Sequence, residues 1–404
     1  MKFLADSRST FEKRIDLAYG PETSIVCRYR NAVRFDDRAK HDLAFKRHLP
    51  ESSIREGERV VPLMTYGGVA IHLLDETSGM ATGSLKSIDG CLTTSLCRME
   101  GIGRIAFESG GNTGSALTLY GRKAGLETFF FCPLDNVDLL DSALFDGRRA
   151  HLIAVEDRGR VKELTGLFAK TAGIRNVPDK SWRYAAGMFR GLFLLEHMLA
   201  AGEFDWISQT VSAAFGPIGI YKALKTFREE GRGLPRFLGV QQEANCPMVR
   251  AWRPAAGGRP GKAGQEQGRL LARIMYDRSP DTHETWRDLR HLLLLTRGDL
   301  LTVNEEEFDS YLRPSAEYGP ILDLLRAQGI AISLRSGQVL DKAGLIALVG
   351  TLKAIDSGLI PAGGSVLCAL TGGVSAADGR AQPELTVRGA QDVLDYVETI
   401  REGG

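Results

Sequence analysis

The sequence contains no apolar run long enough to cross a bilayer, for which a helix needs about 20 apolar residues in succession. The apolar stretch near the N-terminus is also too short for the core of a signal peptide. We therefore expect a cytoplasmic protein that has no membrane partner.

The sequence also has no large excess of positive or negative charge. The chain has 51 basic and 50 acidic side chains, which leaves a formal net charge of +1. A protein that binds nucleic acid usually carries a surplus of basic residues on one face. The composition therefore gives no reason to expect nucleic acid as a partner.

Paired cysteines are a third absence. The six cysteines are scattered along the chain and include no C-x-x-C pair, the spacing that zinc ribbons use. We therefore expect no bound metal, and reduced, mostly buried thiols. The cysteines are Cys27, Cys91, Cys97, Cys132, Cys246 and Cys368.

The chain does contain a regular alternation of short apolar runs and helical patterns from about residue 60 onward. This order predicts a mostly parallel sheet covered by helices, and so a protein of the α/β class. The length of 404 residues suits two domains. A stretch rich in Gly, Pro, Lys and Gln, 253–267, predicts a surface or mobile loop. The predicted strands are 104–108, 128–132, 151–155, 206–213, 236–241 and 365–370, and the predicted helices include 113–124, 161–172, 184–201 and 387–400.

Two motifs in the first third of the chain point to chemistry. Lys86 follows the small residues Thr82, Gly83 and Ser84, and a lysine at such a helix start can form a Schiff base with an aldehyde cofactor. Ser109-Gly110-Gly111-Asn112-Thr113-Gly114 lies between a predicted strand and a predicted helix, where bare backbone N–H groups can hold an anion. An exposed lysine and a tight turn without a ligand are the respective alternatives.

Two further motifs are weaker when each is taken alone. Gly216-Pro217-Ile218-Gly219 follows a predicted strand and is a second candidate anion loop, although Pro217 has no N–H to donate. Thr371-Gly372-Gly373 ends a predicted buried strand, where a hydroxyl can bond a ring nitrogen in a cleft. A plain turn and a threonine that ends a strand are the alternatives.

Together the four motifs resemble those of fold-type II pyridoxal phosphate (PLP) enzymes, in the group of threonine synthase and cysteate synthase. The resemblance runs from about residue 62 to residue 373. It implies two open, mostly parallel twisted sheets covered by helices, as in the β-subunit of tryptophan synthase, with PLP between two domains. The smaller domain would span residues 90–200, and the larger one would combine 1–89 with 201–404.

The resemblance also implies roles for individual residues. Lys86 would be the catalytic residue and would carry PLP, Asn112 would bond the phenolic oxygen of the cofactor, and Thr371 would face its pyridine nitrogen. The loop for the cofactor phosphate would comprise Ala214, Phe215, Gly216, Pro217, Ile218 and Gly219. The substrate carboxylate would be held at Ser109, Gly110, Gly111, Asn112 and Thr113.

Details of the motif sequences favour the cysteate synthase branch of this group. Thr371-Gly372-Gly373 lacks the charged residues that usually follow in threonine synthases, and Arg183 matches an arginine that binds the substrate phosphate. A planar guanidinium suits a phosphate; a surface arginine is the alternative. The resemblance thus implies replacement or elimination at the β-carbon of an O-phosphorylated amino acid such as O-phosphoserine.

Two other functions stay open. One is the threonine synthase reaction, γ-elimination and addition of water on O-phosphohomoserine, and the other is an inactive PLP-binding partner or regulatory subunit. We expect a small amino acid as substrate, and a homodimer. The chain departs from the family at the 214–219 loop, which has little Gly, Asn, Ser or Thr, and at Leu85, where an aromatic residue is usual.

Overall fold

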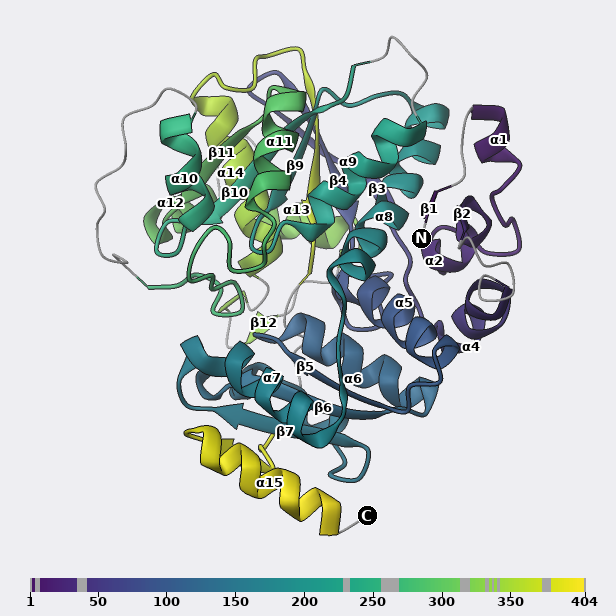
Figure 1. The fold of residues 1–404 in the computed structure, drawn as a ribbon. Coiled ribbons are helices and arrows are strands. Elements are labelled where there is room, and N and C mark those ends of the chain that lie inside the picture. Colours follow the sequence, from purple (N-terminus) through teal and green to yellow (C-terminus); the bar gives the residue numbers. More distant parts are fainter. Residues whose placement is uncertain are drawn as a thin grey trace.

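The computed structural model describes residues 2–3, 8–34, 42–227, 233–255, 269–312, 320–330, 334–335, 338–339, 342–372 and 379–402. These residues form two open sheets with helices packed on both faces of each (Figure 1). Residues 256–267 of the predicted loop lie outside the described residues, as does Gly373.

The larger sheet has six strands in the order β11-β10-β9-β14-β4-β3. All neighbours are parallel except β3, which runs antiparallel to β4 at the edge. The strands are β3 Arg59–Tyr66, β4 Val69–Asp75, β9 Trp206–Thr210, β10 Arg236–Gln242, β11 Asp299–Val303 and β14 Ser365–Leu370.

Alternating residues of the central strand β14 are buried on opposite faces. Leu367 and Ala369 pack in one core with helices α8, α9, α10 and α11, while Val366 and Cys368 pack in a second core with α12, α13 and α14. This period of two is what a strand buried on both sides requires. The helices are α8 Lys180–Ala201, α9 Phe215–Phe227, α10 Pro247–Ala255, α11 Trp286–Thr296, α12 Glu305–Leu312, α13 Ile321–Ala327 and α14 Lys342–Asp356.

The smaller sheet is fully parallel, in the order β15-β7-β6-β5-β8. On β6, Phe130 faces the core beneath α6, whereas Phe129 and Phe131 face α7 and α15. Left-handed glycines, Gly125 and Gly173, end α6 and α7. The elements are β5 Arg104–Glu108, β6 Glu127–Pro133, β7 Ala150–Val155, β8 Arg175–Asn176, β15 Leu385–Val387, α6 Asn112–Ala124, α7 Val161–Ala172 and α15 Ala390–Glu402.

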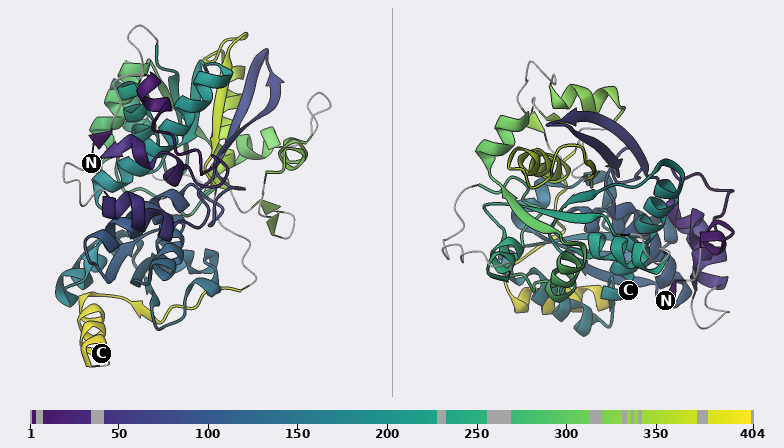
Figure 2. Two further views of the ribbon diagram at one scale, coloured as in Figure 1. Left: turned by 90° about the vertical axis from the view of Figure 1, so that its right-hand side faces the viewer. Right: turned by 90° about the horizontal axis from the view of Figure 1, so that it is seen from above.

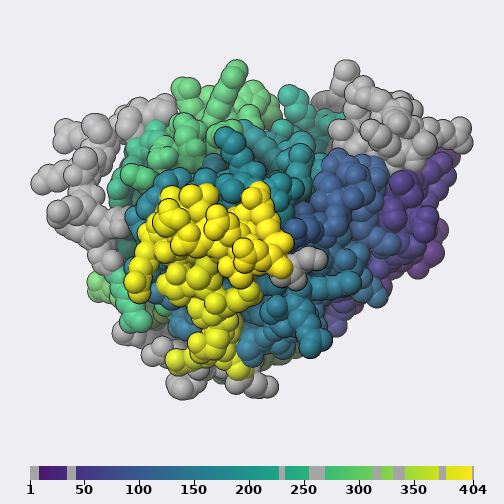
Figure 3. Space-filling view, turned by 60° about the horizontal axis from the view of Figure 1, so that its bottom comes forward, coloured from purple at the N-terminus to yellow at the C-terminus, as the bar shows by residue number. Residues whose placement is uncertain are grey.

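The C-terminal segment differs from the prediction. Instead of one helix over 387–400, β15 comes first and pairs in parallel with β7, and α15 then covers the smaller sheet. The β-branched pair Thr386 and Val387 suits this extended pairing. Figure 3 shows the segment in yellow, spread over this part of the molecule. The division into two domains stays a proposal, with residues 379–402 moved from the larger to the smaller unit.

The N-terminal segment packs against the side of the molecule, beside α5 and α8 (Figure 2). Arg28 makes a bidentate ion pair with Glu196 of α8, with N–O distances of 2.9 and 2.5 Å. Its elements are β1 Lys2–Phe3, α1 Arg8–Glu12, α2 Ile25–Arg28, β2 Val33–Arg34 and α4 Leu49–Ser52, with shorter helical turns at Arg30–Ala32 and Asp42–His48. The neighbouring helix α5 spans Lys86–Met99.

Most predicted elements are present. The strands predicted at 104–108 and 365–370 and the helix at 161–172 have the predicted bounds, whereas β9 ends at Thr210 rather than at residue 213. The remaining short elements are β12 Leu334–Arg335, β13 Gln338–Val339 and turns at Leu134–Leu139, Ser142–Leu144 and Arg158–Arg160. No helix in the described part of the chain is long and apolar enough to cross a membrane.

Candidate active site

A cavity of about 440 Å³ lies where the carboxyl ends of β5, β9 and β14 approach one another. Ligands bind at this end of the strands in open α/β sheets. Every predicted site residue except Ile218 and Gly219 lines the cavity. The lining thus includes Lys86, Ser109, Gly110, Gly111, Asn112, Thr113, Arg183, Ala214, Phe215, Gly216, Pro217 and Thr371.

Lys86 is the first residue of α5, and its backbone N–H donates to the hydroxyl of Ser84 at 3.3 Å. Its Nζ lies 3.0 Å from Oδ2 of Asp89, one helical turn further on. The Asp89 side chain is 6% exposed, whereas that of Lys86 is 28% exposed. A buried carboxylate therefore holds the lysine amine at the wall of the cavity.

The segment before Lys86 is bonded to the end of β14. The N–H of Leu85 donates to the carbonyl of Thr371 at 3.0 Å, and Ser84 forms a bridge with Gly372. Gly372 has φ +75°, and a Cβ at this position would overlap the carbonyl oxygen of Gly83. Only glycine fits so close an approach, and it brings Lys86 and Thr371 to the same cavity.

The turn after β5 exposes the N-terminus of α6 to the cavity. The Ser109 hydroxyl accepts the N–H of Gly111 at 3.0 Å, and the amide of Asn136 donates to the carbonyl of Gly110 at 2.8 Å. α6 then begins at Asn112. The first N–H groups of a helix have no partner within it and carry the positive end of its dipole, so this end of α6 suits an anion.

A second helix N-terminus, that of α9, also meets the cavity. Ala214, just before it, has φ +59°, a left-handed conformation that is rare and strained for a residue with a Cβ. Ile218 and Gly219 do not line the cavity, because they belong to the face of α9 that packs in the core. A Cβ on Gly219 would overlap Gly187 of α8.

Arg183 lies in the first turn of α8 and lines the cavity. Its guanidinium carbon is 5.0 Å from the ring centroid of Phe215, a cation–π distance. Among the described residues, no side chain forms an ion pair with Arg183. A positive group without a counter-ion on a cavity wall is suited to an anionic ligand.

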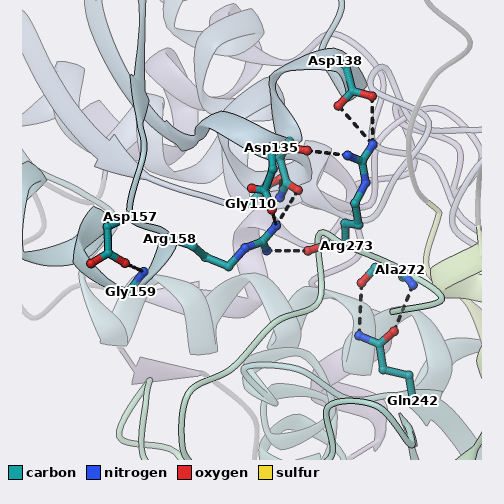
Figure 4. A network of polar contacts seen from close by, with 10 residues as sticks. Gly110, Asp135, Asp138, Asp157, Arg158, Gly159, Gln242, Ala272 and Arg273 are labelled. Carbon is teal, nitrogen blue, oxygen red and sulfur yellow. Dashed lines mark hydrogen bonds and ion pairs between the residues drawn. The ribbon is translucent and has the colours of Figure 1, made fainter. Parts of the chain in front are cut away.

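The segment 272–283 contains none of the predicted site residues, but its residues 274–279, 282 and 283 form another wall of the cavity. On one side Arg158 donates to the carbonyl of Arg273 at 2.9 Å, and the Arg273 guanidinium pairs with Asp138 at 2.9 and 3.0 Å. On the other side the Gln242 amide makes reciprocal hydrogen bonds of 3.0 and 3.1 Å with Ala272 (Figure 4). The segment therefore connects the two sheets across the cavity.

The same segment contributes a polar cluster centred on Asp277, whose side chain is 2% exposed. One carboxylate oxygen accepts from the hydroxyl of Ser212 at 2.8 Å, and the other lies 2.9 Å from Nε2 of His283. Ser212, Asp277 and His283 all line the cavity. The buried carboxylate thus fixes the orientation of an imidazole in the wall.

These additional residues differ in how well the sequence signals them. Arg158 follows the buried strand β7, so the rule that identified Ser109 after β5 could have found it. Asp277 and His283 lie on no helix or strand, and no spacing in the sequence sets them apart. All six cysteines are free and buried, as predicted. In the described ranges, no group of three or more His, Cys, Asp or Glu side chains could hold a metal ion.

Comparison with known proteins shows which sequences the chain is similar to. It is 25% identical to cysteate synthase of Methanospirillum hungatei over 304 residues, which cover 72% of this chain and 67% of that protein. It is also 25% identical to threonine synthase of Methanosarcina acetivorans over 300 residues, with the same coverage. No family model matches the chain.

Comparison with solved structures shows the fold. The structure of threonine synthase from Escherichia coli matches with a TM-score of 0.67 at 13% identity, over 100% of this chain and 92% of that one. The chain therefore has the fold-type II architecture that its motifs predicted.

Proposed function

From the premise that the chain has the fold-type II architecture and is similar in sequence to cysteate and threonine synthases, we propose that it is a PLP-dependent enzyme. Its reaction would be elimination or replacement on an O-substituted amino acid. The observation that carries the proposal is the single cavity lined by Lys86, by the N-termini of α6 and α9, and by Thr371.

The residues present fit PLP. The cofactor has an aldehyde, a phosphate and a ring nitrogen, and the cavity wall offers an amine at Lys86, a helix N-terminus at Phe215 and a hydroxyl at Thr371. The strained Ala214 beside the α9 N-terminus supports a ligand there. Bound to Lys86, PLP would supply an electron sink for charge that develops at the substrate α-carbon. Asn112, at the start of α6, would bond its phenolic oxygen.

The substrate would be oriented by two parts of the cavity wall. The N–H groups of the α6 N-terminus would bind the α-carboxylate, and Arg183 would bind the anionic substituent that leaves. Nζ of Lys86 would take the proton from the α-carbon, and Asp89 would hold that amine in reach of it. The segment 272–283 would exclude water from this region.

Phosphate is the leaving group that these residues favour. Arg183 has no counter-ion among the described side chains, and a guanidinium matches the geometry of a phosphate. We propose β-replacement or elimination on an O-phosphoserine-like amino acid, supported by the similarity to cysteate synthase. The similarity to threonine synthase supports the alternative, γ-elimination and water addition on O-phosphohomoserine. A homodimer remains a prediction.

The decisive experiment has two steps. Purified protein is incubated with PLP, reduced with borohydride and digested, and the labelled peptide is identified by mass spectrometry; we expect the label on Lys86. O-phosphoserine, O-phosphohomoserine and O-acetylserine are then tested for release of phosphate or acetate. Labelling without turnover of any of the three would favour an inactive PLP-binding protein, and labelling of another lysine would refute the site.

A further inference from the structure

A buried arginine lies directly behind the cavity. Arg190 of α8 is 1% exposed, and its Nε and Nη2 donate to the two carboxylate oxygens of Glu76, with Nη2 2.7 Å from Oε2. Nη2 also lies 2.9 Å from Oε1 of Gln209, which lines the cavity. Arginine is almost never buried so fully without a paired carboxylate, and Glu76 supplies that counter-ion.

A second carboxyl completes the cluster. Glu58 is fully buried, and its Oε1 lies 3.9 Å from Nε of Arg190. Burial first, and then the neighbouring charge of Glu76, raise the pKa of Glu58 well above its ordinary value. Burial also raises the pKa of Glu76, and both carboxyl groups lie beside the one guanidinium.

The remaining nitrogen of the Arg190 guanidinium, Nη1, is buried and makes no hydrogen bond with a described residue. A Cβ built on Gly216 would overlap Nη1 and would lie 3.1 Å from Nε2 of Gln209. Nη1 is thus in contact with the backbone of Gly216, a residue of the cavity wall at the start of α9. An unpaired buried donor is costly, so its retention at this place calls for a partner.

The packing of α8 on α9 directs Nη1 toward the helix N-terminus. Arg183 and Arg190 are two turns apart and so lie on the same face of α8. Gly187 lies between them, and a Cβ there would come within 2.7 Å of the carbonyl oxygen of Gly216. The missing side chain lets α8 bring one arginine to the cavity and the other to the back of the α9 N-terminus.

The loop in front of Arg190 is a poor anion site by itself. Residues 214–219 include no Ser, Thr or Asn side chain, and Pro217 has no N–H. An anion at the α9 N-terminus therefore receives few hydrogen bonds from the loop. Gly216 of this loop is thus the residue that Nη1 of Arg190, a donor without a partner among the described residues, approaches from behind.

We propose that Arg190 is the positive group of a phosphate subsite at the N-terminus of α9, with Glu76 as its fixed counter-ion. The ion pair fixes the guanidinium with its free edge, Nη1, toward the back of Gly216, where its positive charge adds to that of the α9 N-terminus. The ligand class is a phosphate monoester, and under the proposed function, on which this inference rests, it is the phosphate of PLP. Arg190 acts through the wall at Gly216, so it is a positioning residue.

The test compares PLP with pyridoxal, which has the same ring and aldehyde but no phosphate. Dissociation constants of the cofactor-free full-length protein are measured for both by absorbance, and inorganic phosphate is titrated as a competitor of pyridoxal phosphate. Arg190→Lys keeps the charge but loses the planar edge. Arg190→Met combined with Glu76→Gln removes the ion pair without leaving Glu76 as an unpaired buried charge. Thermal unfolding checks that each variant folds.

We expect both variants to lower the preference for PLP over pyridoxal about ten- to one-hundredfold and to weaken competition by phosphate. Arg28→Lys serves as the matched control and should leave the preference unchanged, because Arg28 is also a buried arginine paired with a carboxylate of α8 but does not line the cavity. Equal weakening of PLP and pyridoxal binding would mean that Arg190 only supports the fold. If the wild-type protein binds PLP and pyridoxal equally well, the phosphate subsite is refuted. The proposed function would still be supported by the labelling of Lys86. Absence of any labelling would refute the proposed function itself.

Discussion

The backbone N–H of Leu85 donates to the carbonyl oxygen of Thr371 at 3.0 Å, and this bond joins the segment that carries Lys86 to the end of the central strand β14. The two residues are far apart in the sequence and lie on the same cavity wall. The relative position of the lysine amine and the Thr371 hydroxyl is therefore set by backbone contacts, which substitutions of either side chain leave intact.

Lys86→Ala should abolish covalent attachment of PLP, because no amine remains at the start of α5. The absorbance of lysine-bound PLP and the borohydride-labelled peptide should disappear together, along with turnover. Lys162→Ala is the matched control, because Lys162 also lines the cavity but bonds the carbonyl of Thr282. A Lys86→Ala variant that kept the label after dialysis and fresh PLP would show that another lysine is used.

Thr371→Asp should place a carboxylate beside the ring nitrogen of PLP and keep a proton there. A protonated ring withdraws electrons more strongly, so the reaction should shift toward transamination, measured as pyridoxamine phosphate formed per turnover. Thr371→Ser is the control and should keep the wild-type products. An unchanged product ratio in Thr371→Asp would mean that this residue does not face the ring.

Arg183→Ala should lower kcat/KM for a phosphorylated substrate by about one to two powers of ten, because a charge-assisted hydrogen bond contributes roughly 1.5–3 kcal/mol. Arg183→Lys should recover only part of this loss, since an ammonium lacks the planar fork. The comparison is made with O-acetylserine, for which we expect a smaller effect. Equal losses on both substrates would assign Arg183 a purely structural role.

Ala214→Gly should stabilise the protein by about 0.5–1 kcal/mol, because glycine adopts φ +59° without the strain that a Cβ causes. Ala213→Gly is a control one residue earlier, where φ is not positive, and it should destabilise by a similar amount. The free energy of unfolding is measured by denaturant titration without ligand. Destabilisation by both substitutions would mean that the methyl group of Ala214 contributes more through packing than it costs in strain.

The pairing of Arg28 with Glu196 should make stability depend on pH in acid. Burial raises the pKa of Glu196, but the hydrogen bonds of Arg28 and Tyr29 and the charge of Arg28 outweigh it, and the pKa is lowered overall. The contribution is therefore complete above about pH 4.5, the ordinary value for glutamate, and is lost as the pH falls through the lower folded pKa.

Glu196→Gln should accordingly flatten the acid limb of the plot of unfolding free energy against pH below about pH 4.5. The control is Glu163→Gln, which removes a fully exposed partner of Arg160 and should leave this limb nearly unchanged, because exposed pairs contribute little. Parallel curves for wild type and Glu196→Gln would show that the ion pair does not persist in solution.

The parallel sheets could be predicted from the sequence, because their strands are short apolar runs bounded by turn residues. The phenylalanines of β6 and the run that forms β14 are examples. It was misleading at the C-terminus, where the propensity of residues 387–400 for helix concealed β15. A three-residue strand is stabilised mainly by pairing with β7, and such pairing leaves no local signal.

The candidate site was predictable only in part, for a related reason. Lys86, the turn at Ser109 and Thr371 lie next to recognisable elements, so the motif and its structural context coincide. Arg190 had one signal, a lone charge within the apolar stretch of α8, but its partner Glu76 is distant in the sequence. Asp277 and His283 are brought into contact by the path of an irregular segment. Hydrophobic periodicity in the sequence does not predict such a path.

The position of β15 has a consequence for how the protein forms during synthesis. β15 covers the edge of the smaller sheet at β7, a strand in which every residue is buried. Until Leu385–Val387 has been made, that edge presents unpaired backbone groups that other chains can join. The smaller sheet is therefore complete only when nearly the whole chain has been synthesised, and a nascent chain that stops before β15 should be prone to aggregate.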